Sequence, residues 1–299
     1  MAIRFRLGSR GSPLALVQAR MTRDALAAAH GWAADAIEIV PVKTTGDKVQ
    51  DRALAEIGGK ALWTKELDRA LLAGEIDAAV HSMKDVETIR PETIAIAAML
   101  PRADVRDRLI GAESIDALPR GARVGTSSPR RRAQLLALRP DLDIVLFRGN
   151  VDTRLAKLAA GEADATLLAA AGLDRLGRHD LGAPIPLETM LPAPAQGAVG
   201  IECRTDDAAT RMLLAAIDHD ATHRAVAVER AFLAALNADC HSPVAALAAA
   251  GRFAAALYAP DGSDSVRGDT ADVSEAGAAA LATTLLDRAP PAIRALFGA

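Results

Sequence analysis

The sequence predicts an α/β protein in which two lobes of strands and helices are followed by a small α+β domain. The chain has 299 residues, of which 51% are hydrophobic and 24% charged, so it can bury more than one core and is not disordered throughout. Over the first two thirds, strand-like and helix-like segments alternate, a pattern typical of parallel βαβ units. From residue 221 onward this alternation is replaced by short strand-like runs between helices.

The first lobe is expected to span residues 1–100 and to be completed by residues 195–217. Its first helix is predicted at 14–29, because Ser12 can cap a helix and Pro13 fits the first helical position. The other expected elements of this lobe are strands at 3–7, 37–42, 78–80, 94–99 and 198–202, and helices at 61–73 and 208–217.

The second lobe is expected to span residues 104–192, between a polar stretch at 101–107 and a proline-rich stretch at 184–194. Its expected elements are strands at 123–125, 144–147 and 165–169 and helices at 129–138 and 151–160. A C-terminal α+β domain is expected over 221–299. Its expected elements are a helix at 224–236, strands at 244–249 and 253–258, a hairpin turn at Asp261-Gly262, and helices at 275–287 and 292–297.

Composition excludes several classes of protein. The longest apolar runs are short and interrupted by charges, so no membrane span is expected. The first residues lack an apolar signal core, and we expect a cytoplasmic protein. Two cysteines, Cys203 and Cys240, cannot build a disulfide framework. Two Trp, one Tyr and five Phe offer little for stacking on bases, so no nucleic-acid partner is expected.

The segment 120–154 is strongly basic within a chain whose net charge is −3. It holds eight arginines and three acidic residues, so its own charge is +5 and the remaining residues sum to −8. Several of these arginines stand at strand-to-helix turns, where the free N–H groups of a helix N-terminus already favour an anion. Arginine adds bidentate binding of carboxylate or phosphate. The segment therefore predicts a polyanion site.

Three turns of this kind are present. They are Ser9-Arg10-Gly11-Ser12-Pro13, Gly125-Thr126-Ser127-Ser128-Pro129-Arg130-Arg131 and Arg148-Gly149-Asn150-Val151. In a parallel sheet such turns lie at the carboxyl ends of the strands, where ligands bind. A solvated helix face is the alternative for an isolated run of arginines. Repetition at three turns favours the anion site.

Two further motifs could carry chemistry. His81-Ser82-Met83-Lys84-Asp85 follows a buried strand and offers an ammonium and a carboxylate to one ligand, although these two side chains could also pair or face water. Cys240 lies in a turn and could be exposed or structural, whereas Cys203 lies in an apolar strand and is expected to fill the core. His219 and His223 are four residues apart, but no third ligand with metal spacing accompanies them, so no metal site is expected.

Together these segments resemble the porphobilinogen deaminase (hydroxymethylbilane synthase) family, and the match covers nearly the whole chain. The matching motifs include Ser9-Arg10-Gly11-Ser12-Pro13-Leu14-Ala15-Leu16, Gly58-Gly59-Lys60, Lys65-Glu66-Leu67, His81-Ser82-Met83-Lys84-Asp85-Val86, Gly125-Thr126-Ser127-Ser128, Arg130-Arg131, Arg148-Gly149-Asn150-Val151, Thr153-Arg154-Leu155, Ala170-Ala171-Gly172-Leu173 and Gln196-Gly197-Ala198-Val199-Gly200-Ile201-Glu202-Cys203-Arg204. Each motif is short, but their order and spacing along one chain argue against coincidence.

The resemblance implies a transferase that joins four porphobilinogen molecules head to tail, releases ammonia each time and yields linear hydroxymethylbilane. It implies a dipyrromethane cofactor that primes the chain and is held by a thioether to a cysteine. The implied fold has two lobes similar to those of a periplasmic binding protein, with the active site in a central cleft, and a third domain that carries the cofactor cysteine. A monomer is also implied.

The resemblance also implies roles for single residues. Asp85 would be catalytic, because a carboxylate hydrogen-bonded to the pyrrole N–H can stabilise the cation left by ammonia and relay protons. Cys240 would hold the cofactor covalently. The other cofactor-binding residues would be Lys84, Ser82, Arg130, Arg131, Thr126, Ser127 and Ser128. The substrate-binding residues, which face acetate and propionate groups, would be Arg10, Ser12, Arg148, Arg154, Arg175 and Gln196.

The chain departs from the family pattern just before the cofactor cysteine. Ala238-Asp239 stands where the family usually has two glycines, and alanine does not adopt a positive φ cheaply. Asp239 is also expected to disfavour the Cys240 thiolate before attachment. A second departure, Pro129 in place of leucine, suits the first helical turn.

Two other interpretations compete with a tetrapyrrole-forming enzyme. One is a non-catalytic, two-lobed protein that binds carboxylates or other anions. The other is a cysteine-nucleophile hydrolase with His241 as the base.

The resemblance also implies a mobile loop over residues 45–59, with Trp63 at an aromatic position beside it.

Overall fold

The computed structural model describes residues 5–43 and 64–298, which form two compact units. The first unit takes in 5–43, 64–103 and 197–224, and the second takes in 104–196 and 225–298. The second unit holds both the predicted second lobe and the predicted C-terminal domain, so the division of the chain into three domains stays a prediction. The loop predicted at 45–59 and the aromatic position at Trp63 lie outside the described residues.

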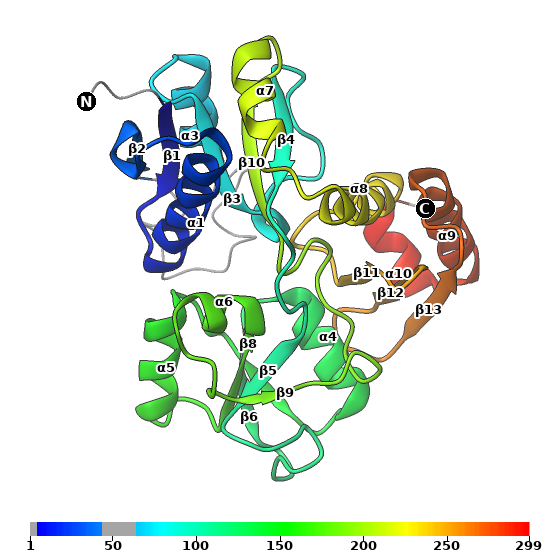
Figure 1. Cartoon of the computed structure of the whole chain (residues 1–299). Helices are drawn as coiled ribbons and strands as arrows, with labels where there is room; N and C mark the ends of the chain where they lie inside the picture. The colour runs from blue at the N-terminus through cyan, green and yellow to red at the C-terminus, as the bar shows by residue number, and fades with distance from the viewer. Residues whose placement is uncertain (1–4, 44–63, 299) are drawn as a thin grey trace. The chain divides into compact units, whose positions relative to one another are not determined.

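The first unit is built on a mixed five-stranded sheet in the order β2-β1-β3-β10-β4 (Figure 1). Strand β1 runs parallel to β2 and β3, whereas β10 runs antiparallel to β3 and β4. The elements are β1 (Phe5–Arg10), α1 (Pro13–His30), β2 (Ile37–Val42), α3 (Lys65–Leu72), β3 (Ala78–Ser82), β4 (Ile94–Met99), β10 (Val199–Arg204) and α7 (Ala208–Ala215), with short 3-10 turns at Ala34–Ala36 and Met83–Asp85.

Both faces of this sheet are covered, as alternating side chains in β3 show. Ala78 and Val80 pack in one core with Leu26 of α1, and Ala79 packs in another with Leu67 of α3. Strands buried on both faces are typical of α/β proteins. The predicted cap of α1 is confirmed, because Ser12 Oγ accepts a hydrogen bond from Ala15 N at 3.3 Å.

The second unit begins with a sheet of the same layout, in the order β7-β6-β8-β5-β9. Strand β6 is parallel to β7 and β8, and β5 is antiparallel to β8 and β9. The elements are β5 (Asp107–Ile110), β6 (Arg123–Gly125), α4 (Pro129–Leu138), β7 (Asp143–Val145), α5 (Val151–Ala159), β8 (Ala165–Ala169), α6 (Ala170–Arg175) and β9 (Ala183–Pro184). In β8, Leu167 packs with Leu135 of α4 and Leu168 packs with Leu173 of α6, so both faces are again covered.

The C-terminal part of the second unit is an antiparallel three-stranded sheet flanked by helices, as the predicted α+β class requires. Its elements are α8 (Asp220–Ala235), which starts in the first unit, β11 (Val244–Ala249), β12 (Arg252–Tyr258), β13 (Ser265–Thr270), α9 (Glu275–Arg288), α10 (Pro291–Arg294) and a 3-10 turn at Ala295–Phe297. One sheet face holds Phe253 against Phe232 of α8, and the other holds Tyr258 in a core with Ala133 of α4.

The predicted hairpin at Asp261-Gly262 is confirmed between β12 and β13. Gly262 has a φ of +73°, and a Cβ there would lie 2.5 Å from Ala137 N of α4. The turn therefore packs on α4 too closely for any side chain. The helix predicted at 292–297 is instead divided into α10 and a 3-10 turn.

Strands β5 and β9 and helix α6 have no counterpart among the predicted strands and helices. Strand β5 begins at Asp107, inside the polar stretch that the sequence suggests as a boundary. The stretch gives no sign of a strand because Asp107 is an acidic residue, although it is buried in the structure. The antiparallel directions of β5 and β10 were also not foreseen, since βαβ units alone produce parallel neighbours.

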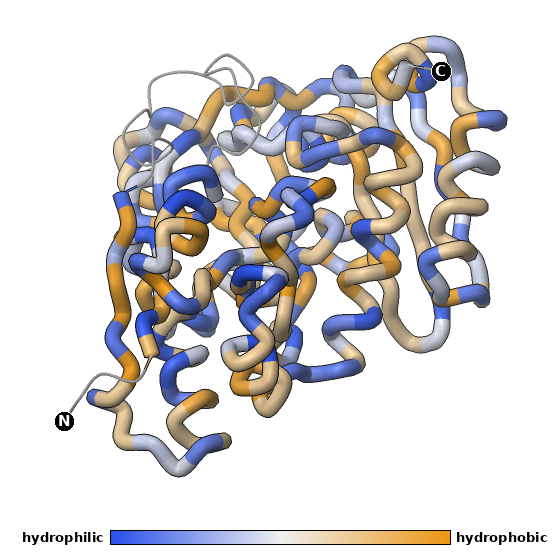
Figure 2. Tube along the Cα trace, turned by 90° about the horizontal axis from the view of Figure 1, so that it is seen from above, coloured by the Kyte–Doolittle hydropathy of each residue, from blue (hydrophilic) through white to orange (hydrophobic). Residues whose placement is uncertain are grey.

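Figure 2 shows blue and orange stretches alternating along the coiled parts of the trace. Among the described residues, no helix combines the length and the apolar character that crossing a membrane requires.

Candidate active site

In the first unit, the carboxyl ends of two parallel strands meet at a pocket. Strand β1 ends at Arg10 and β3 ends at Ser82. The polar residues that line the pocket are Arg10, Ser12, Gln18, His81, Ser82 and Asp85. The structure thus brings together four residues that the sequence singled out, Arg10, Ser12, Ser82 and Asp85.

Gln18 was not predicted as part of the site. It is buried on α1, and its Nε2 donates a hydrogen bond to Ser82 Oγ at 2.8 Å. A signal for it exists in the sequence, because Gln18 falls among Ala15, Ala19 and Thr22 on the buried stripe of the helix. A long polar side chain on such a stripe needs a buried partner, and here that partner belongs to the pocket.

The turn that carries Asp85 is anchored by the buried side chain and backbone of Met83. Met83 is buried, its backbone N donates to Ala198 O at 3.1 Å, and it lies against Gly200, where a Cβ would be 2.1 Å from Met83 Sδ. Lys84 and Asp85 are half-buried on the same turn. Met83 therefore fixes the turn while leaving the Asp85 carboxylate at the pocket.

A buried ionic network lies behind this turn. Arg90 contacts three carboxylates: Nη2 is 2.6 Å from Asp68 Oδ1, Nη1 is 2.6 Å from Glu87 Oε2, and Nε is 2.8 Å from Glu202 Oε1. His81 Nε2 lies 3.2 Å from Glu202 Oε2. Burial acts to raise the pKa of Glu202, but His81 and Arg90 outweigh it and lower that pKa to about 2.

In the second unit, the hydroxyl-rich turn after β6 starts α4 as predicted. Ser128 caps the helix through a hydrogen bond from Arg131 N to its Oγ, and Thr126 Oγ1 accepts from Ser128 N at 3.2 Å. Gly125 is required at the end of β6, since a Cβ there would lie 2.3 Å from the Phe147 ring. The turn is thus held both by its own hydroxyls and by the packing beneath it.

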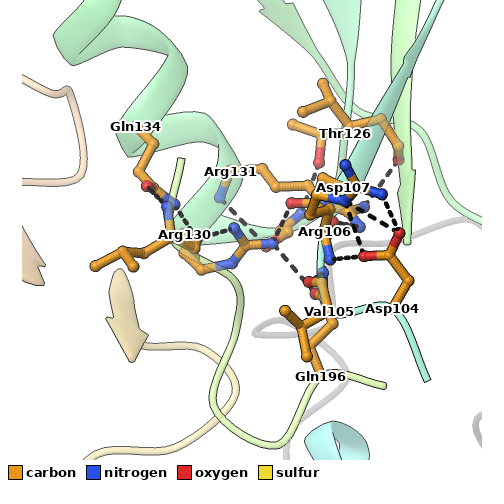
Figure 3. Close-up of polar contacts among 12 residues, drawn as sticks. Asp104, Val105, Arg106, Asp107, Thr126, Arg130, Arg131, Gln134 and Gln196 are labelled. Atoms are coloured by element: carbon orange, nitrogen blue, oxygen red, sulfur yellow. Dashed lines mark hydrogen bonds and ion pairs between the residues drawn. The ribbon is translucent and has the colours of Figure 1, made fainter. Parts of the chain in front are cut away.

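Arg130 and Arg131 both point toward Asp107 (Figure 3). Arg130 Nη2 is 2.7 Å from Asp107 Oδ2, and Arg131 Nη2 is 2.7 Å from Asp107 Oδ1. The two arginines, which we call the arginine pair, are 3% and 5% exposed. Burial alone would raise the pKa of Asp107, but the two guanidinium groups hold it well below the ordinary value.

Gln196 completes this cluster from the segment before β10. Its Nε2 donates to Asp107 Oδ1 and to Val105 O, each at 2.8 Å. Gln196 was expected to bind substrate, and the structure places it at 1% exposure on the carboxylate of Asp107. Asp107 itself was not predicted, because a single acid in a polar stretch gives no sign of a partner more than twenty residues away.

The arginine pair carries more charge than Asp107 can compensate. Two guanidinium groups against one carboxylate leave a net charge of +1 in a buried place. The Nε atoms of Arg130 and Arg131 are buried and have no hydrogen-bond partner in the described part of the chain. A buried donor and a surplus positive charge both call for an anion. The pair is therefore suited to bind an anion such as a carboxylate.

Arg154 connects two of the predicted turns. Its Nη2 donates to Ser127 Oγ at 3.3 Å and its Nε donates to Gly149 O at 3.0 Å. Arg148, which is buried, precedes the turn where Asn150 caps α5. Arg175 ends α6, and its burial lowers the pKa of its guanidinium. The three residues belong to the same unit as the arginine pair.

The two cysteines differ as the sequence indicates. Cys240 is exposed in the loop between α8 and β11, whereas Cys203 is buried in β10. Burial raises the pKa of the Cys203 thiol to about 11, which leaves it unreactive at neutral pH. Cys240 is thus the accessible thiol of the two.

The loop before Cys240 avoids the conformational cost expected of its missing glycines. The left-handed residue there is Asn237, with a φ of +51°, and neither Ala238 nor Asp239 has a positive φ. Asparagine tolerates this conformation better than most residues. The loop is further tied by a hydrogen bond from Asp239 N to Ser242 Oγ and another from His241 N to Asp239 Oδ1.

His219 and His223 have partners other than a metal. His219 Nδ1 is 2.8 Å from Thr222 Oγ1, and His223 Nδ1 is 2.9 Å from Asp218 Oδ1. Within residues 5–43 and 64–298, no group of three or more His, Cys, Asp or Glu side chains could hold a metal ion.

Comparison with known proteins gives matches along nearly the whole chain. Residues 5–212 match the family model "Porphobilinogen deaminase, dipyromethane cofactor binding domain", and residues 223–288 match "Porphobilinogen deaminase, C-terminal domain". The porphobilinogen deaminase of Sphingopyxis alaskensis is 64% identical over 98% of this chain and 96% of its own length. That of Paracoccus denitrificans is 54% identical over 96% and 95%.

Among solved structures, a periplasmic substrate-binding protein of an ABC transporter from Coxiella burnetii is similar with a TM-score of 0.42 and 14% identity. The match covers 76% of this chain and 97% of that one.

Proposed function

Because this chain belongs to the porphobilinogen deaminase family, we propose that it is a hydroxymethylbilane synthase, a transferase that condenses four porphobilinogen molecules head to tail with release of ammonia. Hydrolysis then frees linear hydroxymethylbilane. We further propose that the enzyme is a cytoplasmic monomer. Family membership favours this function over a non-catalytic anion-binding protein.

The observation that carries the proposal is the pocket in which Asp85 and Arg10 lie together. Loss of ammonia from the aminomethyl arm of the substrate leaves a cation that the pyrrole nitrogen stabilises. The Asp85 carboxylate accepts a hydrogen bond from that pyrrole N–H and stabilises the developing charge. It can also carry a proton to the departing ammonia and remove one from the newly bonded ring carbon.

Arg10 has a different task in the same pocket. Each substrate ring carries an acetate and a propionate, and a guanidinium at the end of β1 can bind either carboxylate in a bidentate manner. Ser12 and the N-terminus of α1 add a hydroxyl and a dipole of the right sign beside it. Binding the acid groups of the ring fixes its pyrrole nitrogen relative to Asp85.

We propose that the cofactor is attached through Cys240, the exposed cysteine of the pair. When bound, the dipyrromethane supplies the primer to which substrate rings are added. The arginine pair would hold carboxylates of this group, since its surplus charge and its buried Nε donors need acceptors. Ser82, Lys84, Thr126, Ser127 and Ser128 are proposed to contribute further hydrogen bonds. Arg148, Arg154 and Arg175 are proposed to bind the acid groups of added rings.

The test of the catalytic role is Asp85→Asn. This change keeps the shape of the side chain but removes its charge and its capacity to take up a proton, so turnover should fall by about 100-fold or more. Porphobilinogen consumption measures turnover, and intact mass and thermal unfolding check the cofactor and the fold. Asp24→Asn is the matched control, because Asp24 lies exposed on α1 and pairs with its neighbour Arg23. Turnover near the wild-type rate in Asp85→Asn would refute the role.

The test of the attachment site compares the two cysteines. Intact mass should show an increment of two linked pyrrole units in the wild type and in Cys203→Ser, and none in Cys240→Ser. Active wild-type enzyme with the mass of the bare polypeptide would refute the cofactor proposal.

A further inference from the structure

Glu229 on α8 is a fully buried carboxylate outside the catalytic pocket and the arginine pair. Its Oε2 accepts a hydrogen bond from Ala195 N at 2.5 Å, and its Oε1 accepts one from Ala248 N of β11 at 2.8 Å. Burying a carboxylate is costly unless its oxygens are used. Both oxygens here are used by backbone N–H groups, so the side chain fastens two separate segments to α8.

The first of these segments has a strained backbone. Ala195 has a φ of +60°, in the left-handed region that a Cβ disfavours. A non-glycine residue persists in this conformation only where its surroundings impose it. The hydrogen bond from Ala195 N to Glu229 Oε2 helps to hold Ala195 in this conformation.

The residue after Ala195 belongs to the cluster around the arginine pair. Gln196 donates from Nε2 to Asp107 and to Val105 O, as Figure 3 shows. Asp107 in turn holds Arg130 and Arg131 through its two oxygens. An unbroken series of contacts therefore runs from Glu229 through the left-handed turn to both guanidinium groups.

We propose that Glu229 is a positioning residue for the arginine pair. It holds Ala195 in the left-handed conformation, which keeps Gln196 on Asp107 and so fixes the direction in which the two guanidinium groups face a ligand carboxylate. The inference rests on the proposed function, in which the pair binds carboxylates of the cofactor. Helix α8 also ends five residues before Cys240, so one helix supports both the attachment loop and the carboxylate site.

Glu229→Gln alone cannot distinguish a positioning role from a general loss of stability. It is therefore combined with a second substitution that should restore the left-handed turn. An amide keeps the size of the side chain but offers one oxygen for two N–H donors, so one contact is lost. Ala195→Gly removes the Cβ that makes the left-handed turn costly, and the turn can then form without its carboxylate partner. Ala250→Gly is the matched control, because Ala250 also has a positive φ, +50°, but lies exposed in the turn between β11 and β12.

The experiment follows how fast full-length apoprotein, supplied with porphobilinogen, gains the mass of two pyrrole units. Loss of one charge-assisted hydrogen bond should slow Glu229→Gln by about tenfold. Glu229→Gln with Ala195→Gly should return to within about threefold of the wild type. Glu229→Gln with Ala250→Gly should stay slow, even where both glycine changes raise the thermal midpoint equally.

Equal rescue by the two glycine changes would show that Glu229 acts only through stability, and absence of rescue by Ala195→Gly would show that the left-handed turn does not transmit its effect. Either result overturns the inference. A wild-type apoprotein that gains no mass contradicts the proposed function itself, and the inference falls with it.

Discussion

The two five-stranded sheets share one layout but treat buried charge in opposite ways. Behind the Asp85 turn, Arg90 is surrounded by three carboxylates, so acids outnumber arginine. Behind the turn after β6, two arginines share the single carboxylate of Asp107. The first unit thus gathers carboxylates around one arginine, with His81 beside Glu202, whereas the surplus positive charge of the second unit is suited to accept an anion. The same scaffold thus carries the proposed catalytic carboxylate in one place and the proposed carboxylate-binding site in the other.

The largest expected effect comes from removing the shared carboxylate of the second unit. Asp107→Asn leaves two buried guanidinium groups without a counterion, which should lower the free energy of unfolding by about 3–5 kcal/mol. Urea denaturation measures this loss. Asp104→Asn is the control, since Asp104 pairs with a partly exposed Arg106 and should cost less than about 1 kcal/mol. Equal losses in the two variants would show that the buried cluster has no special weight.

The next effect concerns acid stability in the first unit. The pKa of Glu202 is lowered from 4.5 to about 2, so its contribution is present above about pH 4.5 and is lost as the pH falls toward 2. The shift corresponds to about 3 kcal/mol. In Glu202→Gln this part of the pH dependence should disappear, as unfolding free energies measured between pH 2 and 6 would reveal. If the unfolding free energy of Glu202→Gln falls with pH as steeply as that of the wild type, Glu202 is not the cause of the acid sensitivity.

The capped turns could be predicted from the sequence, whereas the buried ion pairs behind them could not. Ser12 and Pro13 at one turn and Ser128 and Pro129 at another predict capped helices, because the cap is a contact between near neighbours in the chain. The carboxyl-end turns could therefore be located. Asp107 could not be assigned, since its partners lie 23 and 24 residues away and its polarity hides the strand that it begins.

The same limit applies to the first unit. His81-Ser82-Met83-Lys84-Asp85 could be recognised as one motif, but Gln18 reaches Ser82 only through the packing of α1 on β3. The loop before Cys240 shows the converse. A departure from two glycines predicts a local cost, yet the fold places the left-handed residue one position earlier, at Asn237.

A moderate effect is expected from crowding the support of the Asp85 turn. In Gly200→Ala the new Cβ would meet Met83 Sδ at 2.1 Å, and moving the methionine should cost about 1–3 kcal/mol and disturb the turn. Thermal unfolding and turnover are the measurements. Gly11→Ala is the control for stability, because a Cβ there meets no heavy atom within 4 Å. Unchanged turnover in Gly200→Ala would mean that Met83 does not position Asp85.

The smallest effect is expected at the link between the two turns of the second unit. Arg154→Lys removes the fork that joins Ser127 Oγ to Gly149 O, with a cost of about 1 kcal/mol or less in unfolding free energy. The KM for porphobilinogen should rise more than kcat falls. Arg178→Lys, on an exposed pair with Asp152, serves as the control and should leave both constants unchanged. A fall in kcat alone would argue against a binding role for Arg154.

The division of labour between the two units can be tested by intact mass on a pair of variants, Asp85→Asn and Arg131→Gln. If the first unit catalyses and the arginine pair holds the cofactor, purified Asp85→Asn carries the increment of two pyrrole units and Arg131→Gln lacks it. An increment on Arg131→Gln as complete as on Asp85→Asn, with both variants folded, would contradict the assignment of cofactor binding to the positive surplus of the second unit.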